Sequence, residues 1–276
     1  MGVRRIDRFW KILTSGSFTL LGKLDTLRVL SSRGKKKKAF YPIRLPVGEL
    51  FVDGENAAVD FQVLAQVFLD VAYGELQLQD RIVIDVGAHK GYFAAYALMA
   101  GAKAVLSYEP EGTNFTCLAR FAESARLHGK AIQVFRAAVS DSDGEVTLHV
   151  SRESWRHTTL AGQEHSSGET LRVRSCSLGS ILDEVKREVF ERELILKIDA
   201  EGAECPLLLN TPAKCFAAVK EVMFEHHSFA GCELHLILDR LQSLGFEYMA
   251  SGREADLHHL RANSHSSCKP LSEVSR

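Results

Sequence analysis

The sequence lacks a long uninterrupted apolar run. Its most apolar N-terminal stretch, residues 18–30, is interrupted by Lys23, Asp25 and Arg28, whereas a membrane-spanning helix needs roughly 20 predominantly apolar residues. The same charges deny this stretch the apolar core of a secretory signal. We therefore expect a cytoplasmic protein without a membrane span.

Paired cysteine motifs are also absent. The six cysteines form no C-x-x-C pair, which argues against a zinc cluster, and we interpret them as separate buried thiols in a reducing compartment. Their positions are Cys117, Cys176, Cys205, Cys215, Cys232 and Cys268. With 46% hydrophobic and 25% charged residues, the composition is that of an ordinary globular protein and excludes a disordered, collagen-like or disulfide-dense chain.

The charges are unevenly distributed along a nearly neutral chain. The 34 basic and 35 acidic residues give a net charge of −1, but residues 1–38 carry eleven basic and two acidic side chains. This segment is therefore at +9 and the remainder at −10. Such an anionic body would repel phosphates, so a nucleic-acid substrate is not expected.

The basic segment forms its own region in the predicted organisation. Apolar residues between positions 3 and 13 recur at helical spacing among basic ones, which predicts a basic amphipathic helix. It would lie on an anionic membrane surface or dock on the body or on a second subunit, and both interpretations stay open. We predict an N-terminal arm over residues 1–40, a catalytic domain over 41–262 and a polar tail over 263–276.

The region after residue 81 alternates between apolar runs and helical patterns. Strands are predicted over residues 82–86, 104–108, 132–137, 194–198 and 219–224, and helices over 92–100, 114–128, 203–210 and 233–244. An earlier helix is predicted over residues 60–73, with Asp60 as its N-cap. The pattern predicts an α/β fold with a Rossmann-like, doubly wound, mostly parallel sheet. Residues 145–150 and 171–176 predict an inserted β-hairpin, joined by a polar loop that contains His157.

The segment 82–93 carries the strongest chemical signal. A buried strand runs into a turn with Gly87 and Gly91, and a helix follows, so the backbone can approach a ligand at the helix N-terminus. Glu109 ends the next strand, eighteen residues after Gly91, where an acid accepts from ribose hydroxyls. His89 stands where a dinucleotide motif requires glycine. Asp85 would repel a pyrophosphate but suits the ammonium and sulfonium of S-adenosylmethionine.

Five motifs resemble those of the FkbM-type methyltransferases. They are D-V-G-A-H-K-G-Y-F, Y-E-P, A-A-V-S-D-S-D-G-E-V-T-L, L-K-I-D-A-E-G-A-E at 196–204 and M-F-E-H at 223–226. The resemblance spans residues 41–261 and implies a Rossmann-like enzyme that uses S-adenosylmethionine to methylate hydroxyls of sugars and natural products. It implies that the methionine end of the cofactor is held by Asp85, Gly87 and Gly91, the ribose by Glu109 and the adenine by Asp141. The family often places Asn or His at the position of His89.

Asp199 and Glu201 follow the fourth strand and are assigned to the reaction centre, since acids at buried strand ends seldom lack a function. Three roles fit them: orienting the acceptor hydroxyl, assisting its deprotonation, or binding a divalent cation. His226 ends the fifth strand and is a candidate general base, although an apolar strand that simply runs into solvent would look the same.

The sequence thus predicts an S-adenosylmethionine-dependent O-methyltransferase acting on a small hydroxylated acceptor. Two alternatives remain at this point. One is a metal-dependent enzyme resembling glycosyltransferases, which would use Asp199 and Glu201 for the metal and leave Glu109 without a role. The other is a non-catalytic interaction protein that binds the cofactor.

Overall fold

A twisted seven-stranded sheet forms the centre of the computed structural model, which describes residues 11–31, 40–70, 72–151, 156–160, 166–188, 194–251 and 256–263. The strand order is β11-β12-β10-β9-β3-β4-β5, with parallel pairing from β10 to β5 and antiparallel pairing of β12 with both neighbours. The strands are β3 (Ile82–Val86), β4 (Ala104–Tyr108), β5 (Ile132–Phe135), β9 (Leu194–Ile198), β10 (Val219–Glu225), β11 (Phe246–Ser251) and β12 (Leu257–Ala262). The predicted doubly wound, mostly parallel sheet is confirmed.

Both faces of this sheet are covered. Side chains alternate between two core clusters: Val83 and Ile195 face one, while Ile84 and Leu196 face the other. The first cluster contains α3 (Ala57–Phe68), α4 (Tyr92–Met99) and α5 (Gly112–Leu127). The second contains α6 (Leu178–Glu188), α7 (Glu204–Asn210) and α8 (Leu234–Ser243). Strands β3 and β9 are buried along their whole length, and their residues are apolar except for Asp85 and Lys197.

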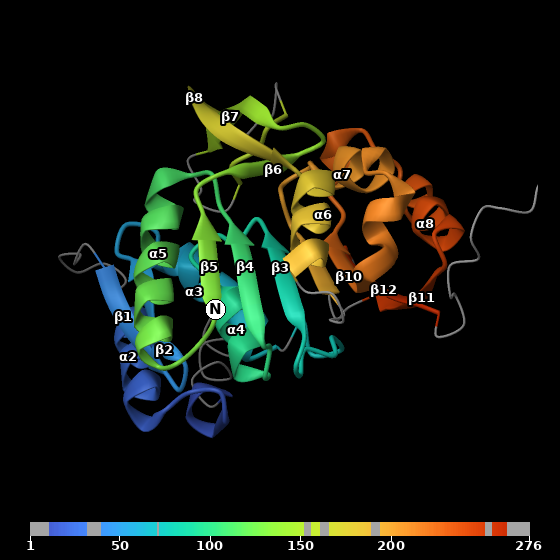
Figure 1. Cartoon of the computed structure of the whole chain (residues 1–276). Helices are drawn as coiled ribbons and strands as arrows, with labels where there is room; N and C mark the ends of the chain where they lie inside the picture. Colours follow the sequence, from blue (N-terminus) through green and yellow to red (C-terminus); the bar gives the residue numbers. More distant parts are fainter. Residues whose placement is uncertain are drawn as a thin grey trace, which may run out of the picture.

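A small second sheet lies over the carboxyl ends of the central strands (Figure 1). Its order is β6-β8-β7, formed by β6 (Ala138–Ser140), β7 (Gly144–Ser151) and β8 (Ser166–Ser177). Strands β7 and β8 pair antiparallel, which confirms the inserted hairpin. Figure 1 therefore shows a lid-like layer above the edge where ligands bind in α/β sheets.

Helix α3 begins earlier than predicted, at Ala57, and ends at Phe68. Asp60 is not its N-cap, because it lies inside the helix with a side chain that is 0% exposed. Its carboxylate is 2.6 Å from the Lys90 ammonium and accepts the N–H of Asp53 at 2.9 Å. A buried charge pair therefore ties α3 to the turn that precedes α4.

The described part of the N-terminal arm packs against the body. Helix α2 (Leu20–Ser31) follows Phe18 in the chain and contains Val29, and both side chains are buried in the first core cluster. The next element is a hairpin of β1 (Phe40–Leu45) and β2 (Gly48–Asp53). Asp25 is 2.7 Å from the Arg44 guanidinium. Residues 1–10 and 32–39 lie outside the described residues. A membrane or subunit contact through residues 1–38, and the boundary near residue 40, stay predictions.

One cysteine pair overturns the interpretation of the cysteines as separate thiols. Cys205 and Cys232 form a disulfide across 27 residues, with their Cα atoms 6.1 Å apart, within the range that a disulfide spans. Sequence spacing could not reveal this pair, because the fold alone brings α7 beside the segment before α8. Cys117, Cys176 and Cys215 are free thiols, and Cys268 lies outside the described residues. Within the described residues, no helix combines the length and apolar character needed to cross a membrane.

Truncating Phe18 should destabilise the whole domain if residues before 40 belong to its core. Phe18 is 5% exposed and its ring centroid is 5.6 Å from that of Phe68. We expect Phe18→Ala to lower the free energy of unfolding by about 3 kcal/mol in urea titrations. Leu20→Ala is the matched control, because Leu20 is 78% exposed, and should change it by less than about 0.5 kcal/mol. Equal effects of the two substitutions would contradict this packing.

Candidate active site

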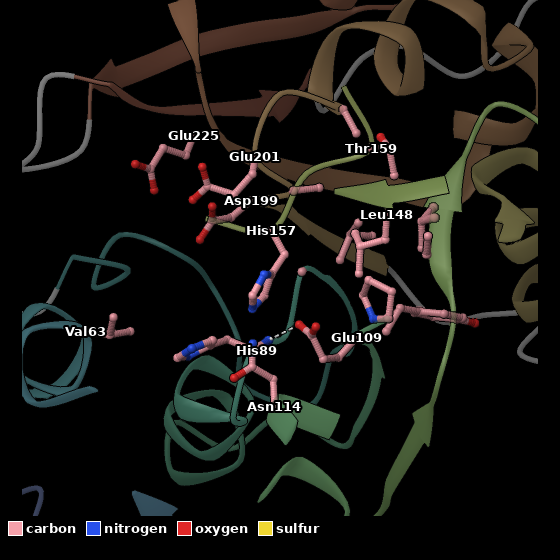
Figure 2. A pocket seen from close by; sticks show the side chains of 18 of the residues that line it. Val63, His89, Glu109, Asn114, Leu148, His157, Thr159, Asp199, Glu201 and Glu225 are labelled. Carbon is pink, nitrogen blue, oxygen red and sulfur yellow. Dashed lines mark hydrogen bonds between the residues drawn. The ribbon is translucent and has the colours of Figure 1, made fainter. Parts of the chain in front are cut away.

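A pocket of about 420 Å³ lies at the carboxyl edge of the central sheet. It spans the point between β3 and β9 where the strand order reverses, the usual ligand position in such sheets. Its walls come from helix α3, from the turns that follow β3, β4 and β9, from the end of β10, and from the small sheet. Figure 2 shows side chains from all these regions converging on one space.

The turn after β3 forms the floor of the pocket. Gly87 has a φ of +74°, and a Cβ at this position would overlap the carbonyl oxygen of Asp199. Only glycine therefore allows the turns after β3 and β9 to touch. His89 also has a positive φ, +52°, a conformation that His tolerates better than most side chains. Gly87 and His89 both line the pocket, and their binding of the cofactor stays a prediction.

Glu109 lies at the end of β4, beside this turn. Its Oε2 atom accepts the main-chain N–H of His89 at 2.8 Å (Figure 2), and its Oε1 atom accepts that of Glu111 at 2.9 Å. Although Glu109 is only 5% exposed, it lines the pocket. Burial raises the pKa of Glu109 to about 8. The two N–H donors fix the carboxyl group of Glu109 in place. Its other oxygen lone pairs stay available to accept hydrogen bonds from a ligand.

Three more carboxylates meet on the other side of the pocket. Asp199, Glu201 and Glu225 all line it, and Figure 2 shows them gathered opposite Glu109. Burial raises the pKa of Glu201 to about 8, despite the nearby imidazole of His227. One ligand atom from each of Asp199, Glu201 and His227 lies within 4.8 Å of the others, a spacing that could hold a divalent cation.

A buried ammonium connects the two sides. Lys197 Nζ lies 3.3 Å from Asp85 and 3.5 Å from Asp199, and it donates to the carbonyl oxygen of Gly87 at 2.9 Å. Burial alone would lower the pKa of Lys197, but the two carboxylates raise it above its usual value. Lys197 therefore stays charged and holds the glycine turn against the turn that follows β9.

These features belong to a known family. The Methyltransferase FkbM domain model matches residues 85–248, which include the glycine turn, Glu109 and the carboxylates after β9 and β10. The chain belongs to the FkbM methyltransferase family. No curated protein matches it.

Solved structures with a similar fold are distant from this FkbM methyltransferase. A putative RNA methyltransferase from Pyrococcus horikoshii is 16% identical over 90% of this chain and 100% of its own, with a TM-score of 0.40. The magnesium protoporphyrin IX methyltransferase from Synechocystis, with bound SAM, is 13% identical over 95% and 92%, with a TM-score of 0.36. Superpositions this loose say nothing about the substrate of the FkbM methyltransferase.

Three residues expected to hold the cofactor do not line the pocket. Asp85 is 0% exposed, because its carboxylate faces Lys197 inside the core. Gly91 instead allows α4 to approach α5, since a Cβ there would lie 3.0 Å from Leu118 and 3.1 Å from Phe121. Asp141 follows β6 rather than the third strand of the central sheet. Its exposed carboxylate accepts from the Asn210 amide at 3.2 Å.

The histidine expected at the reaction centre is also displaced. His226 does not line the pocket, and its Nε2 atom is 2.8 Å from the carbonyl oxygen of Cys232. Its neighbour His227 is the one beside the carboxylates, 3.1 Å from Glu204 and 3.5 Å from Glu201. Burial lowers the pKa of His227, but Glu204, Glu201 and Asp199 outweigh it and raise this pKa to about 10. Adjacent residues point in different directions as the strand ends, so His227 and not His226 contacts Glu201, although neither imidazole lines the pocket itself.

The inserted hairpin contributes contacts that the sequence motifs did not reveal. His157 lines the pocket, with its Nδ1 atom accepting the Ser151 N–H at 3.0 Å. Thr158 donates its hydroxyl to the carbonyl oxygen of Glu201 at 2.6 Å. Glu201 has a φ of +49°, which is strained for a residue other than glycine. Thr158 thus holds the strained turn that carries Glu201.

Helix α3 supplies the remaining wall, which was not predicted either. Gln62 and Gln66 are four residues apart on one face of the helix, and Asp70 follows four residues later. All three line the pocket together with Tyr73. The prediction of a helix over residues 60–73 named none of these residues as site residues, and only the fold shows that this face of the helix meets the pocket.

Removing the Lys197 charge should destabilise the fold. Lys197→Met leaves Asp85 buried without its ammonium partner, and we expect a loss of about 3–5 kcal/mol in guanidinium unfolding. The double variant Lys197→Met/Asp85→Asn should recover part of that loss, because no charge is then left buried and unpaired. Lys214→Met, at an exposed position, is the control. A Lys197→Met protein as stable as this control would contradict the assignment.

Proposed function

We propose that this FkbM methyltransferase uses S-adenosylmethionine to methylate a hydroxyl of a small acceptor such as a sugar or a natural product. The observation that carries the proposal is the single pocket in which Glu109 faces Asp199 and Glu201 across the glycine turn. A non-catalytic binding protein would need no such group of carboxylates beside its cofactor.

The donor set fits this cofactor better than a dinucleotide. Among the described residues, none of those lining the pocket is a lysine or an arginine, the side chains that usually bind a pyrophosphate. Glu109 suits two ribose hydroxyls, and the main chain at Gly87 and His89 lies beside it. Since Asp85 is buried, Asp199 is the carboxylate available to the cationic end. When bound, S-adenosylmethionine supplies an electrophilic methyl group.

The acceptor hydroxyl would then lie between Asp199 and Glu201. Asp199, held by Lys197, orients the hydroxyl, and Glu201 accepts its proton at a carboxylate oxygen and releases it to water. A pKa near neutrality is the most effective for such a base, which the burial of Glu201 provides. The small sheet above the strand ends would exclude water. A divalent cation at Asp199, Glu201 and His227 is a second way to polarise the hydroxyl.

Cofactor binding tests the first half of the proposal. S-adenosylhomocysteine should bind the protein in calorimetry, and NAD should not. Above pH 8, where Glu109 is ionised, Glu109→Gln should weaken this binding at least about tenfold, because charged acceptors make stronger hydrogen bonds. Glu123→Gln is the control, because Glu123 is exposed on helix α5, which follows Glu109 in the chain. Unchanged affinity in Glu109→Gln would remove the ribose role.

The same titrations have an expected pH dependence. With a pKa of about 8, Glu109 is mostly protonated at pH 7 before the ligand binds, and the ribose hydroxyls favour the carboxylate form. Affinity should therefore rise as the pH increases through 8 and then level off. Titration of the ligand's own ammonium affects its affinity for both proteins equally. The difference between the pH profiles of wild type and Glu109→Gln therefore reports the titration of Glu109.

Methyl transfer tests the second half. An acceptor is first identified by screening hydroxylated compounds for release of S-adenosylhomocysteine and a mass gain of one methyl group. Glu201→Gln should then lower kcat about 10²–10⁴-fold, the usual contribution of a general base. S-adenosylhomocysteine affinity should stay within about twofold. Full activity in this variant would exclude Glu201 as the proton acceptor.

A further inference from the structure

The Cys205–Cys232 disulfide lies directly beside the reaction centre. Cys205 follows Glu204 in the first turn of α7, and Cys232 closes the segment that leaves β10. We call residues 226–232 the His227 loop. The disulfide therefore joins the His227 loop to the helix that starts immediately after the reaction-centre turn.

The His227 loop is otherwise lightly held. It contains the 3₁₀ turn η2 (Ser228–Ala230), in which no residue is buried, and Phe229 is 47% exposed. Phe229 and Ala230 lie against Gly202, and the His226 N–H donates to the carbonyl oxygen of Asp256 at 2.7 Å. A segment with so little buried surface opens easily, so a covalent link has a large effect on its position.

His227 connects this loop to Glu201. Its Nδ1 atom is 3.1 Å from Glu204, which is 2% exposed and accepts the N–H groups of Ala200 at 2.8 Å and Gly202 at 2.9 Å. Its Nε2 atom points the other way, 3.5 Å from Glu201. A chain of contacts thus runs from the fixed Glu204 through the imidazole to the carboxylate in the pocket, with Glu225 3.8 Å from the same Nε2.

We propose that His227 is a positioning residue for Glu201, and that the Cys205–Cys232 disulfide holds His227 in place. Oxidation of this pair then controls the rate of methyl transfer while leaving cofactor affinity unchanged. The inference rests on the proposed function, because it assumes that Glu201 accepts the acceptor proton. Within the part of the chain that the structure describes, the hydrogen bonds of Glu109 go to the main chain of His89 and Glu111 and none goes to the His227 loop.

The redox step is an ordinary thiol–disulfide exchange. One glutathione disulfide oxidises the two cysteine thiols, forming the Cys205–Cys232 bond and two molecules of glutathione; two glutathione thiols reverse it. Both cysteines are half-buried rather than enclosed, which gives a small thiol access to the bond.

The test compares the oxidised protein, the same protein reduced with dithiothreitol, and Cys205→Ser/Cys232→Ser. Mass spectrometry after N-ethylmaleimide labelling reports the state of the pair. We expect kcat to fall at least about tenfold in the reduced and double-serine proteins, since small displacements of catalytic groups cost this much or more. S-adenosylhomocysteine affinity should stay within about twofold. Hydrogen exchange should speed up in residues 226–232 and not around Glu109.

Two controls separate positioning from stability. Cys176→Ser, at a free thiol of the small sheet, should behave as wild type and keep its sensitivity to dithiothreitol. His227→Ala should lower kcat, and His227→Gln, which retains a donor toward Glu201, should restore part of it. Wild-type kcat in the reduced protein would overturn the inference. So would a joint loss of kcat and S-adenosylhomocysteine affinity, which indicates general destabilisation. If oxidised wild type fails to bind S-adenosylhomocysteine, the proposed function itself is wrong.

Discussion

The contact between Lys197 and three main-chain or carboxylate oxygens is the constraint on which the site depends. One buried ammonium reaches Asp85 on β3, the carbonyl oxygen of Gly87 and the carboxylate of Asp199. The turns that follow the two central strands are thereby tied together. A hydrophobic residue could fill the same volume, but it could not orient a carboxylate at the pocket wall while keeping a second one in the core. Asp85 therefore contacts Lys197 inside the core and does not line the pocket.

A second constraint is that the groups holding the pocket carboxylates come from segments far apart in the sequence. Glu109 is held by the turn after β3, whereas Glu201 is held by Thr158 of the inserted hairpin and contacted by His227. Glu109 and Glu201 thus have separate direct contacts, although Lys197 joins the two turns beside them. This separation explains why a change in the His227 loop is expected to affect the reacting end and not the nucleoside end.

The sequence predicted the central strands well, because burial on both faces makes strands such as β3 and β9 apolar at all but one position, and turn residues bound them. It also predicted that Gly87, Glu109 and Asp199 meet at one edge, since parallel strands end together. It failed where side-chain direction or distant packing decides. Three features depend on the fold: His227 rather than His226 contacts Glu201, Asp85 is buried, and Cys205 is bonded to Cys232. The prediction of Asp60 as an N-cap was wrong because an acid near the start of a helix is typical of a cap. In the structure Asp60 forms an ion pair with Lys90 instead.

The Asp60–Lys90 pair also sets where a self-sufficient unit of this chain must start. The family match begins at residue 85, but Lys90 lies within it with a side chain that is 0% exposed, and its carboxylate partner stands 30 residues earlier on α3. A fragment beginning at the match would keep the ammonium in the core and lose that carboxylate, at a cost of about 3–5 kcal/mol. It would also lose one wall of the pocket. The segment that the family model matches is therefore shorter than the segment that folds without this loss. A fragment that keeps the Asp60–Lys90 pair must include helix α3.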